Sequence, residues 1–168
     1  MSRLSESLPF MIFEEVRDGS RYAQDLFTRK FSSAIPNYPH HFIALYRSAA
    51  GSLHVASYGH VIVHDGMGLG GGSCTDERVL RMMSSDERAT LRSAGGPHCN
   101  LIRFIFSTMA ERVPVVFAYC GDSRAQIVDL RAGFETTDYP HLLRRAVRSV
   151  EADELIELTR RAAARGPF

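Results

Sequence analysis

Apolar and polar positions along the chain follow two different periods, which together predict a mixture of strands and helices. Apolar runs rich in β-branched and aromatic residues are typical of strands, whereas apolar residues at three- and four-residue spacing are typical of amphipathic helices. Strands are predicted at Phe10–Val16, Phe42–Arg47, Leu53–His64, Gly66–Thr75, Val115–Ala118 and Pro140–Val147. Helices are predicted after Ser20, from Ser84 to Gly95, from Pro97 to Met109, from Ala125 to Ala132 and over Glu151–Arg165.

The segment Val115–Phe134 carries the sharpest local pattern. Its apolar strand is broken by Gly121 and Asp122, a short helix follows, and Gly133 stands where a helix end needs a left-handed residue. Glycine adopts a positive φ without a steric penalty, and the aromatic residue after it can pack on the last turn. The pattern therefore predicts a strand, a turn and a capped helix, with another strand starting at once.

Other boundaries are marked by capping and turn residues. Ser84 and Glu87 form a capping box, Gly95 and Gly96 stop that helix, and Pro97 suits the first turn of the next one. The predicted order is β–α–β–β–β–α–α–β–α–β–α. This order is typical of an α+β fold in which an antiparallel meander meets the strand at Val115.

Length and composition predict one soluble globular domain. The chain has 168 residues, of which 45% are apolar and 23% charged, enough to bury one sizeable core. We expect a single domain over residues 1–168, with residues 148–168 forming an appended C-terminal helix.

Charge and hydropathy narrow the expected partners. Twenty basic and nineteen acidic residues give a net charge of +1, which favours no nucleic-acid partner. No run approaches the roughly 18 apolar residues of a membrane helix, and Met1–Phe13 lacks a long apolar stretch. Three scattered cysteines, Cys74, Cys99 and Cys120, suit buried thiols better than disulfides or a zinc site. A cytoplasmic protein without a membrane partner is expected.

Taken together, the strand, short helix and Gly133-Phe134 of the segment Val115–Phe134 resemble the GNAT superfamily of acyl-CoA-dependent N-acyltransferases. The resemblance extends outward over Phe10–Val147. It implies a GNAT-like fold with a mixed central sheet and helices on both faces. It also implies acetyl-CoA or another acyl-CoA as co-substrate, and an amine as acceptor.

The segment Arg92–Pro97, RSAGGP, is similar to the acyl-CoA loop of that superfamily. A glycine-rich turn before a helix presents backbone amides that suit a pyrophosphate. The resemblance implies that Arg92 contributes charge and that Gly95 and Gly96 flank the phosphates. His98, in the first helical turn, joins them as a cofactor-binding candidate.

Two features of this loop depart from the superfamily pattern. Pro97 stands where the superfamily has glycine or alanine, and it has no N–H to donate. The segment Asp76–Leu91 is also longer than the pattern, which allows Arg92 to lie on the preceding helix. A simple corner between two helices is the competing interpretation of the glycines.

Acyl transfer needs a polarised thioester carbonyl and a proton for the departing thiolate. The resemblance places the first task on backbone amides near Ser73 and Cys74, in a stretch where five of ten residues are glycine. The tyrosine that protonates the thiolate in the superfamily is replaced here by Asp129. An aspartate could act as an acid only if its pKa were raised, and a solvent-facing helix residue is the competing interpretation. Substitutes are offered by Tyr119, Cys120 and Ser123.

A base for the amine proton is predicted on the strand Leu53–His64. Tyr58 and His60 share one face with His54 and His64 by the period of two. At ~3.3 Å per residue, His60 and His64 lie about 13 Å apart, too far to bind one metal ion. No metal site is therefore predicted, and the competing interpretation of the strand is a solvated polar face. His98 and Cys99 point in different directions at a helix start, which disfavours a Cys/His hydrolase.

Three functions remain open at this stage. The first is an N-acyltransferase for a small-molecule or protein amine, with the loop Ile35–His41 beside the acceptor. The second is a GNAT-like acyl-CoA-binding or regulatory module without turnover. The third is a sensor domain of unrelated α+β fold. A homodimer is an open expectation for each.

Overall fold

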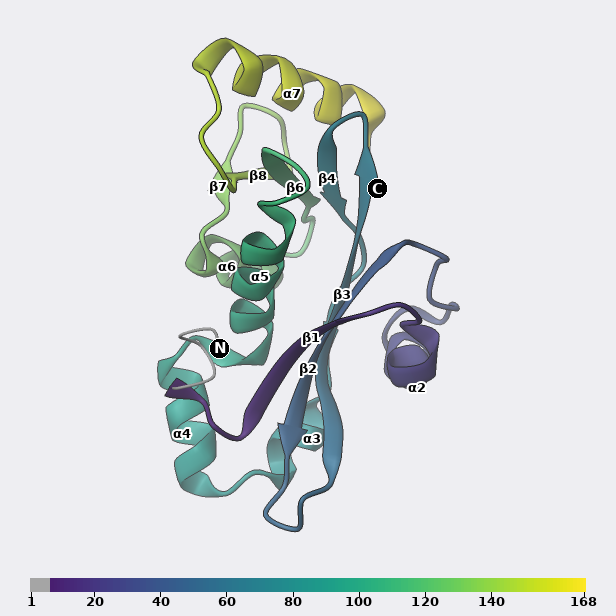
Figure 1. Ribbon diagram of the computed structural model, residues 1–168, viewed down its shortest axis with the longest axis vertical. Coiled ribbons are helices and arrows are strands. Elements are labelled where there is room, and N and C mark those ends of the chain that lie inside the picture. Colours follow the sequence, from purple (N-terminus) through teal and green to yellow (C-terminus); the bar gives the residue numbers. More distant parts are fainter. Residues whose placement is uncertain (1–6) are drawn as a thin grey trace. The chain divides into compact units, whose positions relative to one another are not determined.

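The computed structural model describes residues 7–168, so the first six residues of the N-terminal segment considered above lie outside the described residues. Figure 1 labels the elements. The chain divides into two compact units. The first comprises the chain up to His60 together with Gly72–Leu101, and the second comprises Val61–Gly71 with Ile102–Phe168. That the whole chain forms a single domain stays a prediction.

The first unit is built on an antiparallel meander. Strand β1 (Met11–Val16) pairs with β2 (His40–Arg47) from Met11 opposite Tyr46 to Val16 opposite His41. Next in order comes β3 (Leu53–His64), and the short strand β5 (Cys74–Thr75) pairs with β3 on its other side. The interior of β2 is almost wholly buried, because its apolar residues form a continuous run.

Helices α2, α3 and α4 belong to this unit. Helix α2 (Ser20–Phe31) buries Ala23, Leu26 and Phe27, residues that recur at helical spacing. Asp76 caps α3 (Glu77–Met82), and its carboxylate accepts a hydrogen bond from the N–H of Arg78. The predicted capping box of Ser84 and Glu87 is confirmed at the start of α4 (Ser85–Ser93).

Helix α5 (Gly96–Met109) begins at the second of two left-handed glycines. Gly95 has φ +103° and Gly96 has φ +90°. These values are open to glycine and strained for other residues, which explains the pair in the sequence. The prediction that the glycines separate two helices, with Pro97 in the first turn of the second, is confirmed.

The second unit contains the end of β3 and four further strands. Residues Val61–His64 of β3 form a hairpin with β4 (Met67–Gly70), and Asp65 and Gly66 both have positive φ in the turn between them. Strand β4 runs parallel to β6 (Val115–Tyr119). The antiparallel strands β8 (Leu142–Ala146) and β7 (Glu135–Thr136) complete this part.

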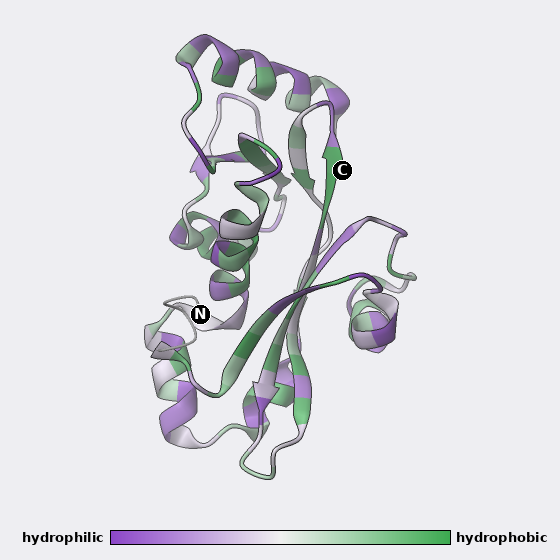
Figure 2. Ribbon diagram, in the orientation of Figure 1, coloured by the Kyte–Doolittle hydropathy of each residue, from purple (hydrophilic) through white to green (hydrophobic). Residues whose placement is uncertain are grey.

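The core of the second unit is apolar. Helix α7 (Ala152–Arg165) packs Leu158 and Ala162 against strand residues that include Phe117 and Leu142. Figure 2 shows alternating hydrophobic and hydrophilic residues along α7. Helix α6 (Ser123–Ala132) ends at Gly133 with φ +119°, so the predicted left-handed cap is confirmed. No helix within residues 7–168 is both long and apolar enough to cross a membrane.

Hydrogen bonding orders the strands as β1-β2-β3-β4-β6-β8-β7, with β5 off this path on β3. The sheet is mixed: β4 and β6 run parallel, whereas the pairs β1–β2, β3–β4, β3–β5, β6–β8 and β7–β8 are antiparallel. The strand predicted directly after the Gly133 cap is present as β7. The sequence prediction missed helix α3 and the division of the glycine-rich segment into β4 and β5. Each of these elements has six residues or fewer, too few to show a clear period.

Candidate active site

The glycine-rich segment contains a β-bulge. Tyr58 of β3 lies opposite Cys74, whereas Val61 lies opposite Gly70. Two residues of β3 between these pairs therefore face the three residues Gly71–Ser73. One extra residue breaks the ladder locally, which leaves backbone amides of this segment outside the regular pairing. The glycine composition anticipated this feature, because glycine in a strand often marks a bulge.

His98 links this segment to β3 within the first unit. Its Nδ1 lies 3.2 Å from Oγ of Ser57, and its Nε2 lies 3.1 Å from Oγ of Ser73. Ser57 in turn donates to the carbonyl oxygen of Cys74 at 2.9 Å. Burial lowers the pKa of His98 to about 4, so its ring is neutral at pH 7.

The directions of these hydrogen bonds follow from the proton count. Ser57 has a single hydroxyl proton, which goes to the Cys74 carbonyl, so Ser57 accepts from Nδ1–H of His98. The neutral ring then carries no proton on Nε2, and Ser73 donates to it. His98 thereby fixes the side chain of Ser73, at the end of the bulge. The sequence prediction placed His98 at the cofactor; the structure places its ring between two serines.

Asn100 holds the turn before α5. Its side-chain amide donates to the carbonyl oxygens of Gly96 at 2.7 Å and Ala94 at 3.1 Å, and its side chain is buried. Two carbonyls of the turn are thus fixed from the protein side. A Cβ added at Gly96 would meet nothing within 4 Å, so the space beside this backbone is open.

Arg92 and Pro97 are the other residues of this loop that the sequence analysis singled out. Arg92 is exposed and lies in the last turn of α4, not in the glycine turn. Pro97 is buried in the first turn of α5, where it leaves one fewer N–H to donate. Arg92 therefore carries its charge at the end of α4, whereas the backbone amides belong to the turn and to the start of α5.

Three aromatic side chains form a buried hydrogen-bonded chain beside β3. Nδ1 of His41 lies 2.8 Å from the hydroxyl oxygen of Tyr58, which lies 3.3 Å from Nδ1 of His60. All three are at most 3% exposed. The solvated-face interpretation is therefore wrong for Tyr58 and His60, because α2 covers this face with Phe27. Burial raises the pKa of Tyr58 and lowers that of His60 to about 4.

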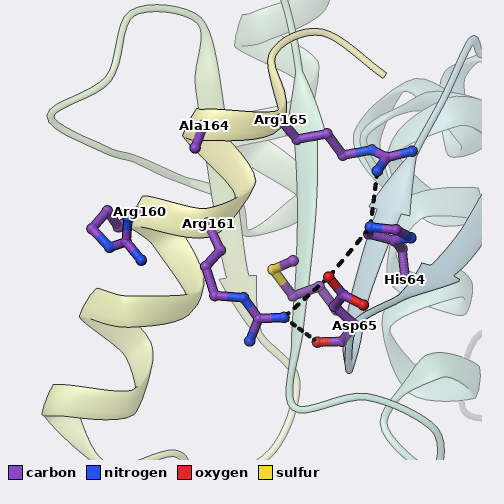
Figure 3. Close-up of a pocket in the computed structure, with 7 residues that line it drawn as sticks. His64, Asp65, Arg160, Arg161, Ala164 and Arg165 are labelled. Atoms are coloured by element: carbon purple, nitrogen blue, oxygen red, sulfur yellow. Dashed lines mark hydrogen bonds and ion pairs between the residues drawn. The ribbon is translucent and has the colours of Figure 1, made fainter.

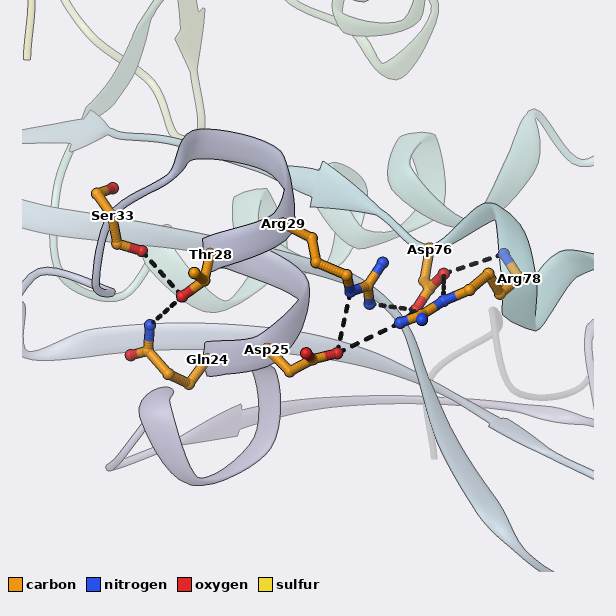
Figure 4. Close-up of polar contacts among 7 residues, drawn as sticks. All are labelled: Gln24, Asp25, Thr28, Arg29, Ser33, Asp76 and Arg78. Atoms are coloured by element: carbon orange, nitrogen blue, oxygen red, sulfur yellow. Dashed lines mark hydrogen bonds and ion pairs between the residues drawn. The ribbon is translucent and has the colours of Figure 1, made fainter.

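Charged and polar side chains of α2 form a network with the loop after α2 and with the start of α3 (Figure 4). Arg29 binds Asp76 at 2.8 Å and Asp25 at 3.0 Å, which joins α2 to the residue that follows β5. Burial opposes ionisation of Asp76, but hydrogen bonds from Arg29 and Arg78 leave its pKa lowered. Thr28 donates to the carbonyl of Ser33 at 3.2 Å, so the same helix also holds the loop after it.

Asp129 lies in the second unit and is buried, with 8% of its surface exposed. The solvent-facing interpretation is therefore wrong; α6 instead exposes Ile127 and Leu130. Burial raises the pKa of Asp129, although a hydrogen bond with Cys120 acts in the opposite direction. Burial and the Asp129 contact together raise the pKa of Cys120 to about 11, so its thiol stays protonated.

Tyr119 ends β6 in the second unit, and its ring contacts Phe168 edge to face at 5.9 Å between centroids. Cys74, in the first unit, is buried, and burial raises its pKa to about 12, so its thiol is a packing group in this site. Within residues 7–168 no cluster of histidine, cysteine and carboxylate side chains is arranged to hold a metal ion.

A hollow of about 350 Å³ lies in the second unit, away from the predicted site residues (Figure 3). It lies between the β3–β4 turn and α7. Arg161 binds Asp65 at 3.3 Å, and Arg165 donates to His64 at 2.9 Å. The other lining residues are Met67, Arg160 and Ala164.

Comparison with known proteins identifies the fold. No family model matches the chain, and no curated protein matches its sequence. Among solved structures, a GNAT-family acetyltransferase from Staphylococcus aureus Mu50 aligns over 82% of this chain and 99% of its own, with 12% identity and a TM-score of 0.54. The ribosomal-protein-S18-alanine N-acetyltransferase from Escherichia coli aligns over 85% and 97%, with 11% identity and a TM-score of 0.49. The protein AtaT, complexed with acetyl-methionyl-tRNAfMet, aligns over 88% and 98%, with 12% identity and a TM-score of 0.43.

The chain thus has the GNAT fold, with its mixed sheet and helices on both faces. The predicted resemblance and fold class are confirmed. The expectations of a cytoplasmic location, of a homodimer and of no nucleic-acid partner stay predictions.

Sequence reasoning missed three side chains of the first unit. His41 was placed in a loop, Asn100 was one polar residue on an apolar helix, and Ser57 lay unremarked between Ala56 and Tyr58. The signal that could have found Asn100 is a polar residue soon after the end of a helix, where the last carbonyl oxygens, here that of Ala94, need a donor. His41 and Ser57 have no comparable local signal, because their partners are distant in sequence.

Proposed function

We propose that this protein is an N-acyltransferase that moves an acetyl or other acyl group from acyl-CoA to an amine by direct attack. The observation that carries the proposal is the bulge at Gly71–Ser73 within a GNAT fold. It leaves backbone amides of a central strand outside the ladder, where they can bind the pantetheine arm and polarise a carbonyl.

The turn before α5 supports acyl-CoA as the co-substrate. Its amides and the positive end of the α5 dipole suit a pyrophosphate, and Arg92 adds a charge. Asn100 fixes the turn carbonyls from the interior, so the turn is organised before a ligand binds. The open space beside Gly96 would admit the phosphates.

The proposed chemistry moves two protons. His60, with Tyr58 beside it, accepts the proton that the amine nitrogen loses as its electron pair forms the bond to the acyl carbon. The carbon–sulfur electron pair leaves with the thiolate. Asp129, whose pKa is raised by burial, is the candidate acid that protonates that sulfur, with Tyr119 as the alternative. Neutral His98 and Ser73 hold the end of the bulge in place during the reaction.

A catalytically silent acyl-CoA-binding or regulatory module is the second candidate. Two observations favour it: Pro97 removes one amide from the phosphate turn, and Asp129 is held by Cys120 where the superfamily has a tyrosine. Such a module would keep the turn and the bulge and bind acyl-CoA without transfer.

Calorimetric titration with acetyl-CoA, followed by thiol release with a panel of small amines and peptide N-termini, tests the proposal. An enzyme binds acetyl-CoA and releases thiol faster when its amine is added, whereas a silent module binds without release. Arg92→Ala should weaken binding about tenfold through the loss of a charged contact. Arg88→Ala, an exposed arginine one turn earlier on α4, is the matched control and should leave binding unchanged. No measurable binding by the unaltered protein would refute both candidates.

A further inference from the structure

Packing alone does not explain the hydrogen-bonded chain of His41, Tyr58 and His60. Three polar aromatic side chains lie in line in a region otherwise filled by Phe27, Leu26 and Ile43. Their contacts join β2 to β3, with the Tyr58 hydroxyl between two imidazoles. Phenylalanine at position 58 would fill nearly the same volume without a polar atom to satisfy.

The space around the chain is shaped to hold these rings. A Cβ at Gly19 would come within 2.6 Å of Nδ1 of His41 and 3.0 Å of Cε2 of Tyr58. Gly19 has an ordinary helical φ of −66°, so its backbone does not require glycine. Its role is to leave room for the His41 ring. On the other side, Tyr38 stacks on His60 with 4.6 Å between ring centroids.

The proton on each nitrogen can be assigned from the two hydrogen bonds of the Tyr58 hydroxyl. This hydroxyl has a single proton, which goes to the nearer imidazole nitrogen, Nδ1 of His41 at 2.8 Å, rather than to Nδ1 of His60 at 3.3 Å. Nδ1 of the neutral His41 ring is therefore an acceptor, and the proton of that ring lies on Nε2. Tyr58 then donates to His41 and accepts from Nδ1–H of His60. Nε2 of His60 carries the lone pair.

We propose that Tyr58 and His41 are positioning residues that form a proton relay behind His60, an inference that rests on the proposed acyl transfer. When Nε2 of His60 takes the amine proton, Nδ1–H of His60 passes to the Tyr58 oxygen, and the Tyr58 hydroxyl proton passes to Nδ1 of His41. His60 and Tyr58 end neutral, and His41 ends as imidazolium. One proton has moved across each of the two hydrogen bonds, and the three side chains together hold one additional proton, the one taken from the amine.

The relay explains how a buried base can work. Desolvation opposes a positive charge on His60, and it also lowers the pKa of His41, but His41 interacts with the Asp18 carboxylate. Ser20 holds that carboxylate, since its hydroxyl donates at 2.6 Å and its N–H at 3.0 Å. The charge therefore moves between two buried rings, to the one that the Asp18 carboxylate attracts, while His40 acts against that charge.

Histidine ¹⁵N NMR of the whole protein tests the tautomers directly. In the unaltered protein at neutral pH we expect His60 to carry its proton on Nδ1 and His41 on Nε2. Tyr58→Phe removes the acceptor for Nδ1–H, so the His60 tautomer should shift toward Nε2–H. Tyr46→Phe is the matched control, because Tyr46 is also a buried tyrosine of the first unit, with its hydroxyl on Glu87. The opposite His60 tautomer in the unaltered protein would overturn the relay.

Kinetics supply the second readout. Tyr58→Phe should lower kcat about 10- to 100-fold with little change in KM, the size of effect that orienting partners have on a reactive histidine. Tyr46→Phe should leave kcat within about twofold. Gly19→Ala keeps all three side chains but displaces His41, and it should reproduce both the tautomer shift and the kcat loss. Full kcat in a folded Tyr58→Phe variant would overturn the relay.

Failure of the relay and failure of the proposed function give different results. If the unaltered protein transfers no acyl group to any amine while His60 shows the expected tautomer, acyl transfer is refuted and with it the role of the relay. If transfer is observed but Tyr58→Phe and Gly19→Ala both retain kcat, the acyltransferase stands and the relay falls. Circular dichroism of each variant at the assay temperature confirms that the comparison is between folded proteins.

Discussion

The two units of the chain bury different kinds of side chain. Among residues 7–168, the buried polar side chains of the first unit are His41, Ser57, His60, Asp76 and Asn100, whereas the second unit buries Asp129 and Thr159. A buried polar group costs free energy unless it is hydrogen-bonded, so polar side chains gather in an interior where their geometry is specified. The contrast teaches that the first unit is organised around polar geometry and the second around apolar packing.

The second unit shows the packing side of this contrast. A Cβ at Gly68 would come within 3.2 Å of side-chain atoms of Val113 and Val116, so even a methyl group is crowded there. Phe117 and Val115 are fully buried in the same core. The stability of this unit should therefore respond to lost volume more than to lost hydrogen bonds.

The largest expected effect is a loss of volume in the second unit. Phe117→Ala should lower the free energy of unfolding by about 3–5 kcal/mol, because it removes a wholly buried ring and leaves a cavity. Phe31→Ala, at a ring that is 41% exposed in the first unit, should cost much less. Urea denaturation of both variants measures the difference. Equal losses would contradict the packing role of the second core.

Acid should weaken the first unit. His60 and His98 have folded-state pKa values of about 4, below the unfolded value near 6.5, so the unfolded chain binds more protons between these values. Their contribution is fully present above pH 6.5 and is lost as the pH falls toward 4, by about 3 kcal/mol for each histidine. Asp129, with a raised pKa, acts in the opposite direction in the second unit.

The effect of acid on stability is measured as the urea midpoint of unfolding at several pH values between 7.5 and 4. His60→Phe should flatten the pH dependence, since it removes one of the two titrating groups. His54→Phe, a partly exposed histidine on the same strand, is the control and should leave the slope unchanged. A stability that stays constant down to pH 4.5 would contradict a neutral buried His60 and His98.

An intermediate effect is expected at the Gly95–Gly96 turn, the proposed phosphate site. Asn100→Ala leaves the carbonyls of Ala94 and Gly96 without their amide donor and should cost about 1–3 kcal/mol. The same change should weaken acetyl-CoA binding, because the turn loses its fixed shape. Ser107→Ala, at an exposed site on the same helix, is the control. Calorimetry and urea denaturation provide both readings, and unaltered affinity in Asn100→Ala would separate the turn from cofactor binding.

The smallest effect is expected on the surface of α7. Arg160 binds Glu157 at 2.7 Å, but both side chains are more than half exposed. Arg160→Ala should therefore change the free energy of unfolding by less than about 0.5 kcal/mol. A loss above about 1 kcal/mol in urea denaturation would show that this surface contributes more than its exposure suggests.

The sequence predicted the framework because its signals are local. The cap at Gly133, the box of Ser84 and Glu87, and the double glycine at residues 95 and 96 each depend on neighbours in the chain. The resemblance carried by Val115–Phe134 then predicted the fold. The solved acetyltransferase structure confirmed the fold. At 12% sequence identity, this likeness is evidence for the fold alone.

The polar interior could not be predicted in the same way. His41 meets Tyr58 across 17 positions, and Ser57 meets His98 across 41, so no spacing in the sequence reveals either pair. The burial of Asp129 could not be predicted from the sequence pattern either. Its helix places apolar Ile127 and Leu130 outward, so a pattern of apolar positions points to the wrong face.

The additional residue at Gly71–Ser73 has a consequence for insertions and deletions. Removing any one of the adjacent glycines would restore an uninterrupted register from Val61 to Ser57. The segment from β4 to β5 would then pair with β3 without a break. The result would be a more regular sheet with no unpaired backbone amides in this segment. A change of one residue in its length would therefore remove the amides on which the proposed acyl-CoA site depends.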